Sequence, residues 1–446
     1  MIDTDLQMLP ETIAKAAEPL PDIGDPAFGA MFDRFADARV VLLGEASHGT
    51  SEFYRARAAI SRRLIERHGF TIVAVEADWP DAAAVDRYVR RRPSRLGEMR
   101  AFERFPTWMW RNTDVEAFVG WLRGHNDGRE RAEMCGFYGL DLYNLSGSMR
   151  AVIDFLGQED PELGRLASQR YACLEPWAED PARYGRHALM EGYARCEVGV
   201  VQMLRQLLEH QVDCLGGECD DWLDAAANAR LVKDAEAYYR VMYHGSAESW
   251  NLRDTHMFDT LKMILDAKGP DSKAIVWAHN SHIGNAAFTD MGMQRDELNI
   301  GQLAKENFGH EARLIGFGTH TGTVAAADDW DEPMQIKRVR PSLPESYERI
   351  SHDSEVPSFL LDLREGERDE GLASELMETR LERFIGVIYR PETERWSHYS
   401  EAILPKQFDA WVWFDESRAV APLPGAQRPG EPHVLTGEEE TYPFGL

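Results

Sequence analysis

The 446-residue sequence has few cysteines and no long apolar run. Its five cysteines include no Cys-x-x-Cys pair, the spacing found in many zinc and redox motifs. We therefore expect reduced thiols and a cytoplasmic location. No stretch reaches the ~18 apolar residues of a membrane span, and the first residues lack the basic start and apolar centre of a secretion signal. We expect no membrane partner.

Basic residues are also scarce relative to acidic ones. The chain holds 49 Lys and Arg against 76 Asp and Glu, which gives a formal net charge of −27. Because so acidic a surface repels phosphate groups, nucleic acid is excluded as an expected partner. The segment from Arg87 to Arg111 interleaves arginines with aromatic residues, and we interpret it as a solvated helix face followed by an aromatic wall. In the alternative interpretation, Trp108 and Trp110 line a cleft and bind an apolar substrate.

Three motifs of common enzyme classes are missing. The nearest run to a Gly-x-Ser-x-Gly elbow is Glu45-Ala46-Ser47-His48-Gly49, which has Glu where the first Gly is required. This argues against an ordinary serine hydrolase. Gly-x-Gly-x-x-Gly and the Walker loop are also absent, which argues against dinucleotide and nucleotide binding. We expect no cofactor.

Hydrophobic residues make up 43% of the chain, enough to bury a sizeable core. Short apolar runs that alternate with helical patterns predict an α/β fold with a mostly parallel central sheet flanked by helices. A helix predicted after the first run can be capped by Thr50 or Ser51 and can end at Gly69. The runs predicted as strands are Val40–Leu43, Thr71–Val75, Cys135–Leu140, Ala274–Ala278, Leu314–Phe317, Phe384–Tyr389 and Ala410–Phe414.

The middle of the chain has a different character. Residues 148–268 show long helical patterns and almost no strand signal. We predict one domain over residues 1–446, interrupted by a helical insertion at 148–268.

Carboxylate and imidazole side chains follow several predicted strands. In a parallel sheet the carboxyl ends of the strands share one edge, where open α/β folds bind ligands. Glu76 is the most informative, because it directly follows an apolar strand and a buried carboxylate needs a cationic or hydrogen-bonding partner. The residues at these strand ends are Glu45, His48, Glu76, Asp78, Asp141, His279, His282 and His320.

This combination of side chains allows two kinds of hydrolytic site. A histidine can act as a general base while a carboxylate orients it and an arginine stabilises an oxyanion. The same groups also suit zinc or manganese. His-x-x-His at a strand end is a weak metal pattern, so we assign no metal ligand and keep a metal-dependent hydrolase as an alternative.

Five sequence blocks, in order along the chain, resemble the erythromycin esterase family. The resemblance covers roughly residues 25 to 420. It implies an α/β hydrolase that opens a macrolide lactone with water and forms no covalent intermediate. The blocks are Gly44 to Phe53, Val75-Glu76-Ala77-Asp78, Asn251-Leu252-Arg253-Asp254, Trp277-Ala278-His279-Asn280-Ser281-His282 and Gln407-Phe408-Asp409-Ala410.

The resemblance also implies roles for single residues. His48 would be the base that activates water, with Glu45 beside it on the same loop. Arg57 and Glu76 would complete the catalytic site together with His279.

The sequence blocks say less about substrate recognition than about the chemistry, because the walls of the cleft come from variable loops and helical insertions. We assign His282, Arg253 and Asp78 to substrate binding, with Trp108 and Trp110 as the aromatic wall.

We therefore predict a hydrolase that acts on a small-molecule carboxylic ester or lactone. A macrolide-like substrate, and with it a role in antibiotic resistance, is one version of this prediction. We further predict that Glu76, Arg57 and His48 meet in one cleft at the carboxyl edge of the sheet. A non-catalytic protein that binds a small molecule or haem is the remaining alternative. The sequence does not indicate an oligomeric state.

Overall fold

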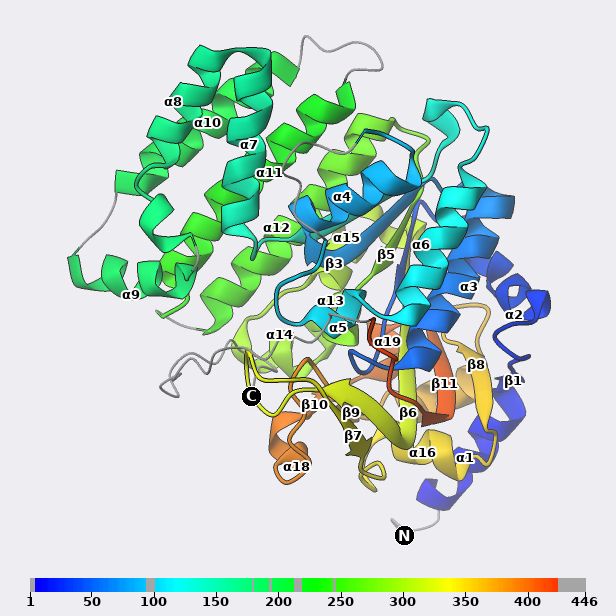
Figure 1. Cartoon of the computed structure of the whole chain (residues 1–446). Coiled ribbons are helices and arrows are strands. Elements are labelled where there is room, and N and C mark those ends of the chain that lie inside the picture. Colours follow the sequence, from blue (N-terminus) through cyan, green and yellow to red (C-terminus); the bar gives the residue numbers. More distant parts are fainter. Residues whose placement is uncertain are drawn as a thin grey trace. The chain divides into compact units, whose positions relative to one another are not determined.

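The computed structural model describes residues 5–93, 101–178, 180–191, 195–211, 219–243 and 246–423 (Figure 1). The fold is mixed α/β, with a mostly parallel central sheet flanked by helices, as the sequence predicted. The chain divides into two compact units. The first consists of residues 1–73, 102–135 and 271–446, and the second consists of residues 74–101 and 136–270.

The first unit contains six strands in the order β1-β8-β11-β6-β2-β5, and β7 pairs with β6. Strands β5, β2, β6 and β11 are parallel neighbours, whereas β1, β8 and β7 pair antiparallel. Strands β9 and β10 form a separate antiparallel pair. The bounds are β1 (Glu18–Pro19), β2 (Val40–Leu43), β5 (Ala274–Trp277), β6 (Ala312–Ala326), β7 (Gln335–Val339), β8 (Ser358–Asp362), β9 (Arg380–Arg383), β10 (Tyr399–Ala402) and β11 (Ala410–Ser417).

The register of this sheet sets where the polar loops begin. Leu43, the last residue of β2, lies opposite Trp277 of β5 and Ile315 of β6. All four residues of β2 are fully buried, as expected for a central strand covered on both faces. The loops after β2 and β5 therefore leave the same edge of the sheet side by side.

Helix α3 (Ser51–His68) follows the loop after β2 and confirms the helix predicted there. Its N-cap residue is Thr50, and Gly69 ends it with φ 73°. The other helices of this unit are α1 (Asp5–Ala16), α2 (Pro26–Ala30), α5 (Thr107–Trp110), α6 (Thr113–His125), α13 (Asn280–Ile283), α14 (Asp290–Arg295), α15 (Ile300–Phe308), α16 (Tyr347–Asp353), α17 (Glu370–Leu376), α18 (Glu394–Ser397) and α19 (Leu404–Gln407).

One strand prediction in this unit was wrong, and another ended too early. Residues 384–389 do not form a strand; they make single bridges, Ile385 with Ser47 and Ile388 with Ala327. Ile385 and Tyr389 are buried because they pack against β6 and β7, in a cluster with Val324, Ala326 and Val339. The strand predicted to end at Phe317 continues to Ala326, because β11 pairs with it as far as Gly322 and β7 pairs with it from Gly322 to Ala326. His320 therefore lies inside β6 and not at a strand end.

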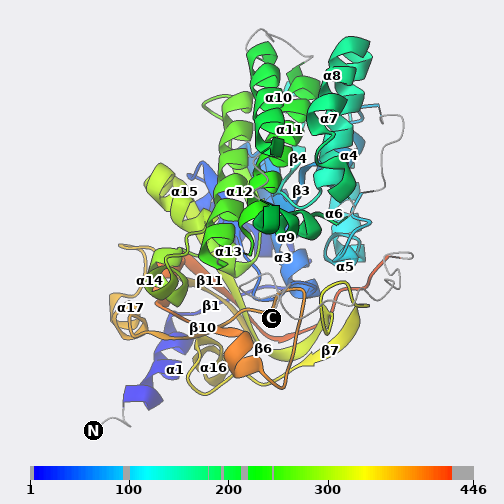
Figure 2. The same cartoon turned by 90° about the vertical axis from the view of Figure 1, so that its left-hand side faces the viewer.

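The second unit contains the neighbouring strands β3 (Ile72–Asp78), from Ala74 onward, and β4 (Gly136–Asp141). Helices α7, α8, α10 and α11 lie side by side in both views (Figures 1 and 2). The helices of this unit are α4 (Trp79–Val89), α7 (Leu145–Glu159), α8 (Pro161–Tyr171), α9 (Pro181–Glu191), α10 (Arg195–Gln211), α11 (Cys219–Val241) and α12 (Ser246–Lys268).

Cys173, which follows α8, forms a disulfide with Cys196 on α10. The expectation of reduced thiols was therefore wrong for this pair, whereas Cys135 is buried and forms no disulfide. No sequence spacing signalled the pairing, because 23 residues separate the two cysteines. The location in the cell stays a prediction.

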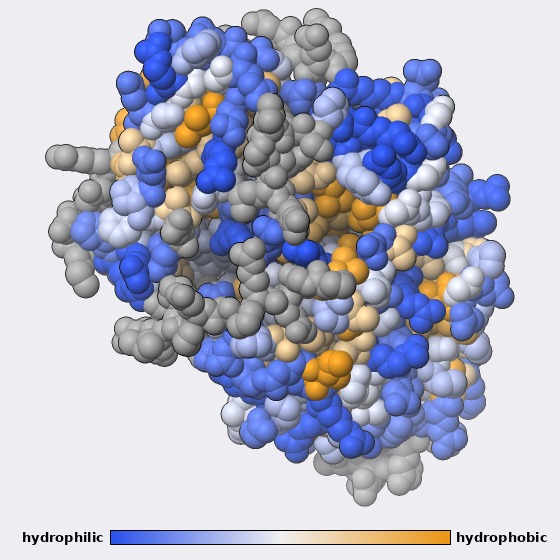
Figure 3. All heavy atoms as spheres, viewed as in Figure 1, coloured by the Kyte–Doolittle hydropathy of each residue, from blue (hydrophilic) through white to orange (hydrophobic). Residues whose placement is uncertain are grey.

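The visible surface is mostly hydrophilic, with separate apolar patches (Figure 3). This agrees with the large excess of acidic residues. Within the described ranges, no helix has both the length and the apolar character that crossing a bilayer requires.

Candidate functional site

The loop after β2 and the helix α3 that follows it carry a buried cluster of Glu45, His48 and Arg57. The Nδ1 atom of His48 lies 2.8 Å from Oε1 of Glu45, and Arg57 on α3 donates from Nη2 to Oε2 of Glu45 at 2.7 Å. Glu45 and Arg57 are fully buried, and His48 is 6% exposed. The guanidinium charge compensates the buried carboxylate, which uses one oxygen for each partner.

Two glycines allow this loop to pack so closely. A Cβ atom on Gly44 would lie 2.1 Å from Oδ1 of Asn280, so only glycine fits there. Gly49 adopts φ 70°, in the left-handed region, and a Cβ there would lie 2.3 Å from the carbonyl oxygen of Ala325. The loop is also held by Ile385, whose carbonyl accepts from the His48 backbone N–H and whose own N–H donates to Ala46.

His279 follows β5 and lies beside His48, with ring centroids 4.9 Å apart. It is the N-cap residue of α13, and its Nδ1 atom accepts from the backbone N–H of Ser281 at 3.3 Å. The Ser281 hydroxyl also lies 2.9 Å from this Nδ1 and can donate to it, and a backbone N–H can only donate, so we place the ring proton of His279 on Nε2. Phe384 packs against the same ring at 5.9 Å between centroids. His282 is buried at the end of α13.

Arg57 is held between two aromatic rings. Its guanidinium carbon lies 4.5 Å from the centroid of Tyr54 and 5.1 Å from that of Trp277. Burial raises the pKa of the Tyr54 hydroxyl well above its ordinary value, and the Glu45 charge adds to this, so the hydroxyl keeps its proton. Trp110 meets Tyr54 edge to face at 6.3 Å. Trp110 and Trp108, which contacts Phe105, are both buried.

The second unit holds a separate cluster around Arg253 of α12. Its Nη2 atom donates to Oε1 of Glu76 at 2.9 Å and to Oδ2 of Asp141 at 2.6 Å, and its Nε atom donates to Oδ1 of Asp141 at 3.0 Å. Burial opposes the charged form of Arg253, but the two carboxylates outweigh it and raise the pKa above its ordinary value. Glu76 is therefore buried with a cationic partner, as its position had predicted. Asp78 is the N-cap residue of α4.

The predicted site residues thus form two clusters. Glu45, His48, Arg57 and His279 come together in the first unit, and Glu76 and Arg253 come together in the second. A meeting of Glu76 with Arg57 and His48 stays a prediction.

The interpretation of the segment after Arg87 as a solvated face was wrong for Arg87 and Arg90. These side chains are buried because they pair with Asp224 and Asp86. Residues 94–100 of the same segment lie outside the described residues.

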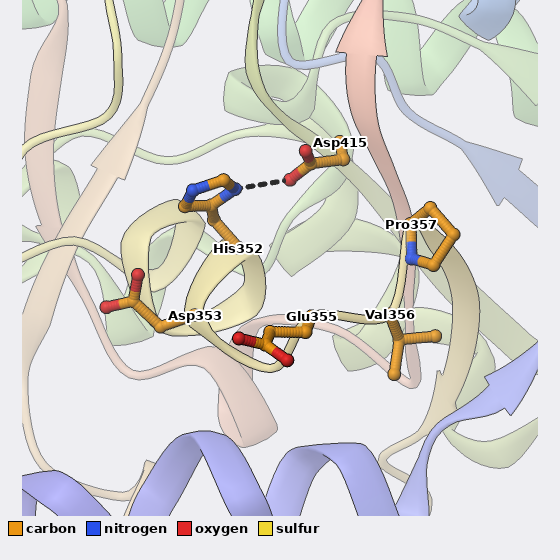
Figure 4. A pocket seen from close by; sticks show the side chains of 6 residues that line it. All are labelled: His352, Asp353, Glu355, Val356, Pro357 and Asp415. Carbon is orange, nitrogen blue, oxygen red and sulfur yellow. Dashed lines mark hydrogen bonds and ion pairs between the residues drawn. The ribbon is translucent and has the colours of Figure 1, made fainter.

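A pocket of about 340 Å³ lies elsewhere in the first unit, near the end of β11 (Figure 4). Across it, the Nδ1 atom of His352 bonds Oδ1 of Asp415 at 2.7 Å. His352 stacks on His320 with ring centroids 3.6 Å apart, so His320 belongs to this pair and not to the His48 cluster. The other lining residues are Asp353, Glu355, Val356 and Pro357.

Three residues that contact this cluster or its loops were not assigned a role from the sequence: Tyr54, which packs on Arg57, Asn280, and Glu382, which bonds Asn280. Asn280 lies within a quoted sequence block, which was a usable signal. Tyr54 lies one helical turn before Arg57 and Glu382 lies far along the chain, so neither gave a signal of its own.

Among the described residues, no group of three or more His, Cys, Asp or Glu side chains is arranged to hold a metal ion. The Nδ1 atom of His48 is hydrogen-bonded to the Glu45 carboxylate, and the Nδ1 atom of His279 accepts a hydrogen bond from Ser281.

Comparison with known proteins adds to this geometry. The sequence model of the family described as erythromycin esterase matches residues 65–417. Glu76, Arg253, His279 and His282 fall within that range, whereas the loop with His48 precedes it. Erythromycin esterase type II of Escherichia coli is 24% identical over 321 residues, which cover 69% of this chain and 75% of that protein.

Two solved structures share the fold. One, described as a succinoglycan biosynthesis protein, superposes with a TM-score of 0.75 at 21% identity and covers 93% of this chain and 98% of its own. The other, a mutant erythromycin esterase in its open conformation, gives a TM-score of 0.64 at 18% identity and covers 90% of this chain and 98% of its own.

Proposed function

The chain belongs to the erythromycin esterase family, and from this premise we propose that it is a hydrolase that cleaves a carboxylic ester or a lactone with water activated by His48. The observation that carries the proposal is the contact between Nδ1 of His48 and the Glu45 carboxylate. Since that contact holds the ring proton on Nδ1, Nε2 keeps its lone pair and can accept a proton from water.

Glu45 and Arg57 act through His48. The carboxylate orients the imidazole and stabilises the imidazolium that forms when water is deprotonated, as the carboxylate of a catalytic triad does. Arg57, fixed between Tyr54 and Trp277, holds the carboxylate from its other oxygen.

His279 supplies the complementary group. With its proton on Nε2, it can donate to the carbonyl oxygen of the ester as negative charge develops there. The proposed division of labour is that His48 accepts a proton and His279 donates a hydrogen bond.

The reaction balances without a covalent enzyme intermediate. Water loses a proton to Nε2 of His48 as its oxygen attacks the carbonyl carbon, and the carbonyl electron pair moves onto the oxygen. The tetrahedral intermediate collapses, the C–O bond to the alcohol breaks, and His48 returns the proton to the leaving alkoxide. The products are an acid and an alcohol, which remain in one molecule when the substrate is a lactone.

Glu76 and Arg253 form the second part of the proposal. With Asp141 they make a trio whose formal charge is −1, because two carboxylates share one guanidinium. We assign Glu76 a role in the same reaction, and Arg253 and Asp78 a role in substrate binding with His282, Trp108 and Trp110.

The substrate class proposed is a small-molecule ester or lactone. A macrolide lactone is the candidate that the relative's name, erythromycin esterase, suggests. A role in antibiotic resistance follows if a macrolide is cleaved.

A substrate screen tests this proposal. The purified full chain would be incubated with 4-nitrophenyl esters, aliphatic lactones and macrolides, with and without a chelator, and its metal content would be measured. Hydrolysis that persists in chelator supports the proposed mechanism. Stoichiometric zinc or manganese, with activity that chelator removes and metal restores, would instead establish the metal-dependent alternative. No turnover of any compound, with a small molecule or haem retained through purification, would establish a binding protein.

A further inference from the structure

Asn280 connects the loop with Glu45 to the loop with His279. Its backbone N–H donates to the Glu45 carbonyl at 2.9 Å, so it contacts the first loop directly. Its side chain lies against Gly44 so closely that no larger residue than glycine fits there. His279, its chain neighbour, is the residue proposed to contact the ester oxygen.

The Asn280 amide makes polar contacts through both of its groups. Its Nδ2 atom donates to the Phe317 carbonyl of β6 at 2.8 Å and to Oε1 of Glu382 at 3.1 Å. Its Oδ1 atom accepts from the Phe317 backbone N–H at 3.3 Å. Both N–H bonds of the amide are therefore used, and its orientation is fixed from two sides.

Glu382 begins a segment, residues 382–385, that contacts both loops. Ile385 bonds the backbone of Ala46 and His48, and Phe384 packs on the His279 ring. Burial raises the pKa of Glu382 well above its ordinary value, and Glu348 beside it raises the pKa further. A neutral Glu382 can bond Asn280 without leaving an uncompensated charge behind the histidines.

We propose that Asn280, held by Glu382, is a positioning residue that fixes the spacing between the Glu45–His48 loop and His279. The inference rests on the proposed function for its catalytic meaning, because it concerns how the two histidines are held for one reaction. Asn280 is assigned no contact with water or ester; it acts through Gly44, Glu45 and His279.

The test uses variants of the full chain. N280D is nearly isosteric and keeps the acceptor for the Phe317 N–H, but its carboxylate cannot donate to the Phe317 carbonyl, and it can keep a hydrogen bond with Glu382 only by accepting the Glu382 proton. In N280D/E382Q the glutamine amide can donate to the introduced aspartate without any proton held between two carboxylates, which secures the hydrogen bond between positions 280 and 382. E382Q alone can still accept from Asn280 and serves as the conservative variant.

The matched control is N126D. Asn126 makes the same two-sided contact with a backbone, donating to the Cys135 carbonyl at 2.8 Å and accepting from its N–H at 2.9 Å. Both of these residues lie outside the two histidine loops. N126D therefore measures how the loss of such an amide–backbone hydrogen bond away from the histidine loops affects stability and activity.

The first readout needs no substrate. Ring ¹⁵N chemical shifts of histidine-labelled protein, assigned with H48N and H279N, report the tautomer and surroundings of both rings. We expect N280D to move the signals of His48 and His279, N280D/E382Q to return them part of the way, and N126D and E382Q to leave them in place. Unmoved signals in a folded N280D would overturn the proposal.

The second readout is hydrolysis of 4-nitrophenyl acetate or another ester that the screen identifies. Displacement of catalytic groups by about 1 Å costs on the order of 10²-fold in rate, so we expect N280D to lower kcat by up to that factor with KM within about threefold. A folded N280D with wild-type kcat would contradict the proposal.

Two further outcomes separate this proposal from the proposed function. If the wild-type chain hydrolyses no ester, the proposed function fails while the chemical shifts still decide whether Asn280 positions the two rings. If N280D does not fold, E382A replaces it: we expect a smaller movement of the same two signals, and unmoved signals would overturn the proposal.

Discussion

Nδ1 of His48 lies 2.8 Å from a carboxylate oxygen of Glu45, three residues earlier on the same turn. The opposite oxygen of that carboxylate accepts from Arg57. The position of one carboxylate therefore determines both the orientation of the proposed base and the charge balance around it.

Replacing Glu45 with glutamine should affect both activity and stability. The glutamine side chain retains a polar group near His48 but leaves the fully buried Arg57 without a counter-charge, which costs about 3 kcal/mol in free energy of unfolding. Without the carboxylate the imidazolium is not stabilised, and we expect kcat to fall by about 10²-fold or more. Urea unfolding and steady-state kinetics would measure these two effects.

E52Q is the matched control for that variant. Glu52 also pairs with an arginine and lies on the same helix α3, but its partner is Arg418 and not a residue of the His48 cluster. Equal losses of activity in E45Q and E52Q would show that Glu45 has only a structural role.

His279 should act as a hydrogen-bond donor and not as the base. In H279F the ring position stays filled but the Nε2 proton is lost, and removal of one oxyanion donor typically costs ~10²–10³ in kcat. KM should change little, because the hydrogen bond strengthens mainly in the transition state. The exposed His310 provides the control H310F. A wild-type kcat in H279F would exclude the donor role.

Glu76 and Asp141 bind the same arginine, and this allows a paired comparison. E76Q and D141N each remove one charge from Arg253. We expect the two variants to lose similar amounts of stability. If Glu76 acts in the reaction, E76Q should also lower kcat by about 10-fold or more, whereas D141N should retain more activity. If the two variants lose activity in proportion to stability, Glu76 is only a structural partner of Arg253.

The buried imidazole of His398 should make the stability of the protein depend on pH. Burial lowers the pKa of His398 from 6.5 to about 4. As the pH falls, the unfolded chain therefore protonates His398 before the folded chain does. The contribution of the neutral, buried His398 to the free energy of unfolding is present above pH 6.5 and is lost progressively toward pH 4. The loss amounts to about 3 kcal/mol.

H398Q tests this assignment, because the glutamine side chain can still accept from the Arg390 N–H that His398 Nε2 now binds. Urea unfolding at several pH values should show a flatter pH dependence in H398Q than in the wild type. The same pH dependence in both proteins would rule out His398 as its source.

The parts of the fold that the sequence predicted depend on local pattern. The Val40–Leu43 run is buried on both faces and the helix after it has one apolar stripe, so both were recognisable. Strand β7 was not recognisable, because most of its side chains are exposed and it is held by pairing with β6. Residues 384–389 looked like a strand because packing against β6 and β7 also requires apolar side chains.

The candidate site also contains some contacts that are local in the sequence and others that are not. Glu45 and His48 share one short turn, so their proximity followed from the sequence. The role of Asn280 depends on Phe317 and Glu382, which lie 37 and 102 residues away along the chain. Such contacts arise only from the tertiary fold, which brings Phe317 of β6 and Glu382 of β9 to Asn280. The Cys173–Cys196 pairing depends likewise on helix packing.

The central claim is that His48 is the base, and its most direct test is the kcat of H48N on an ester that the wild type hydrolyses. The asparagine keeps a polar side chain in the turn but cannot accept and return a proton. The account predicts that kcat falls by ~10²–10⁴ while the unfolding transition and substrate binding are retained. A folded H48N with a kcat within a few-fold of the wild type would contradict it, because His48 would then serve only the structure of the turn.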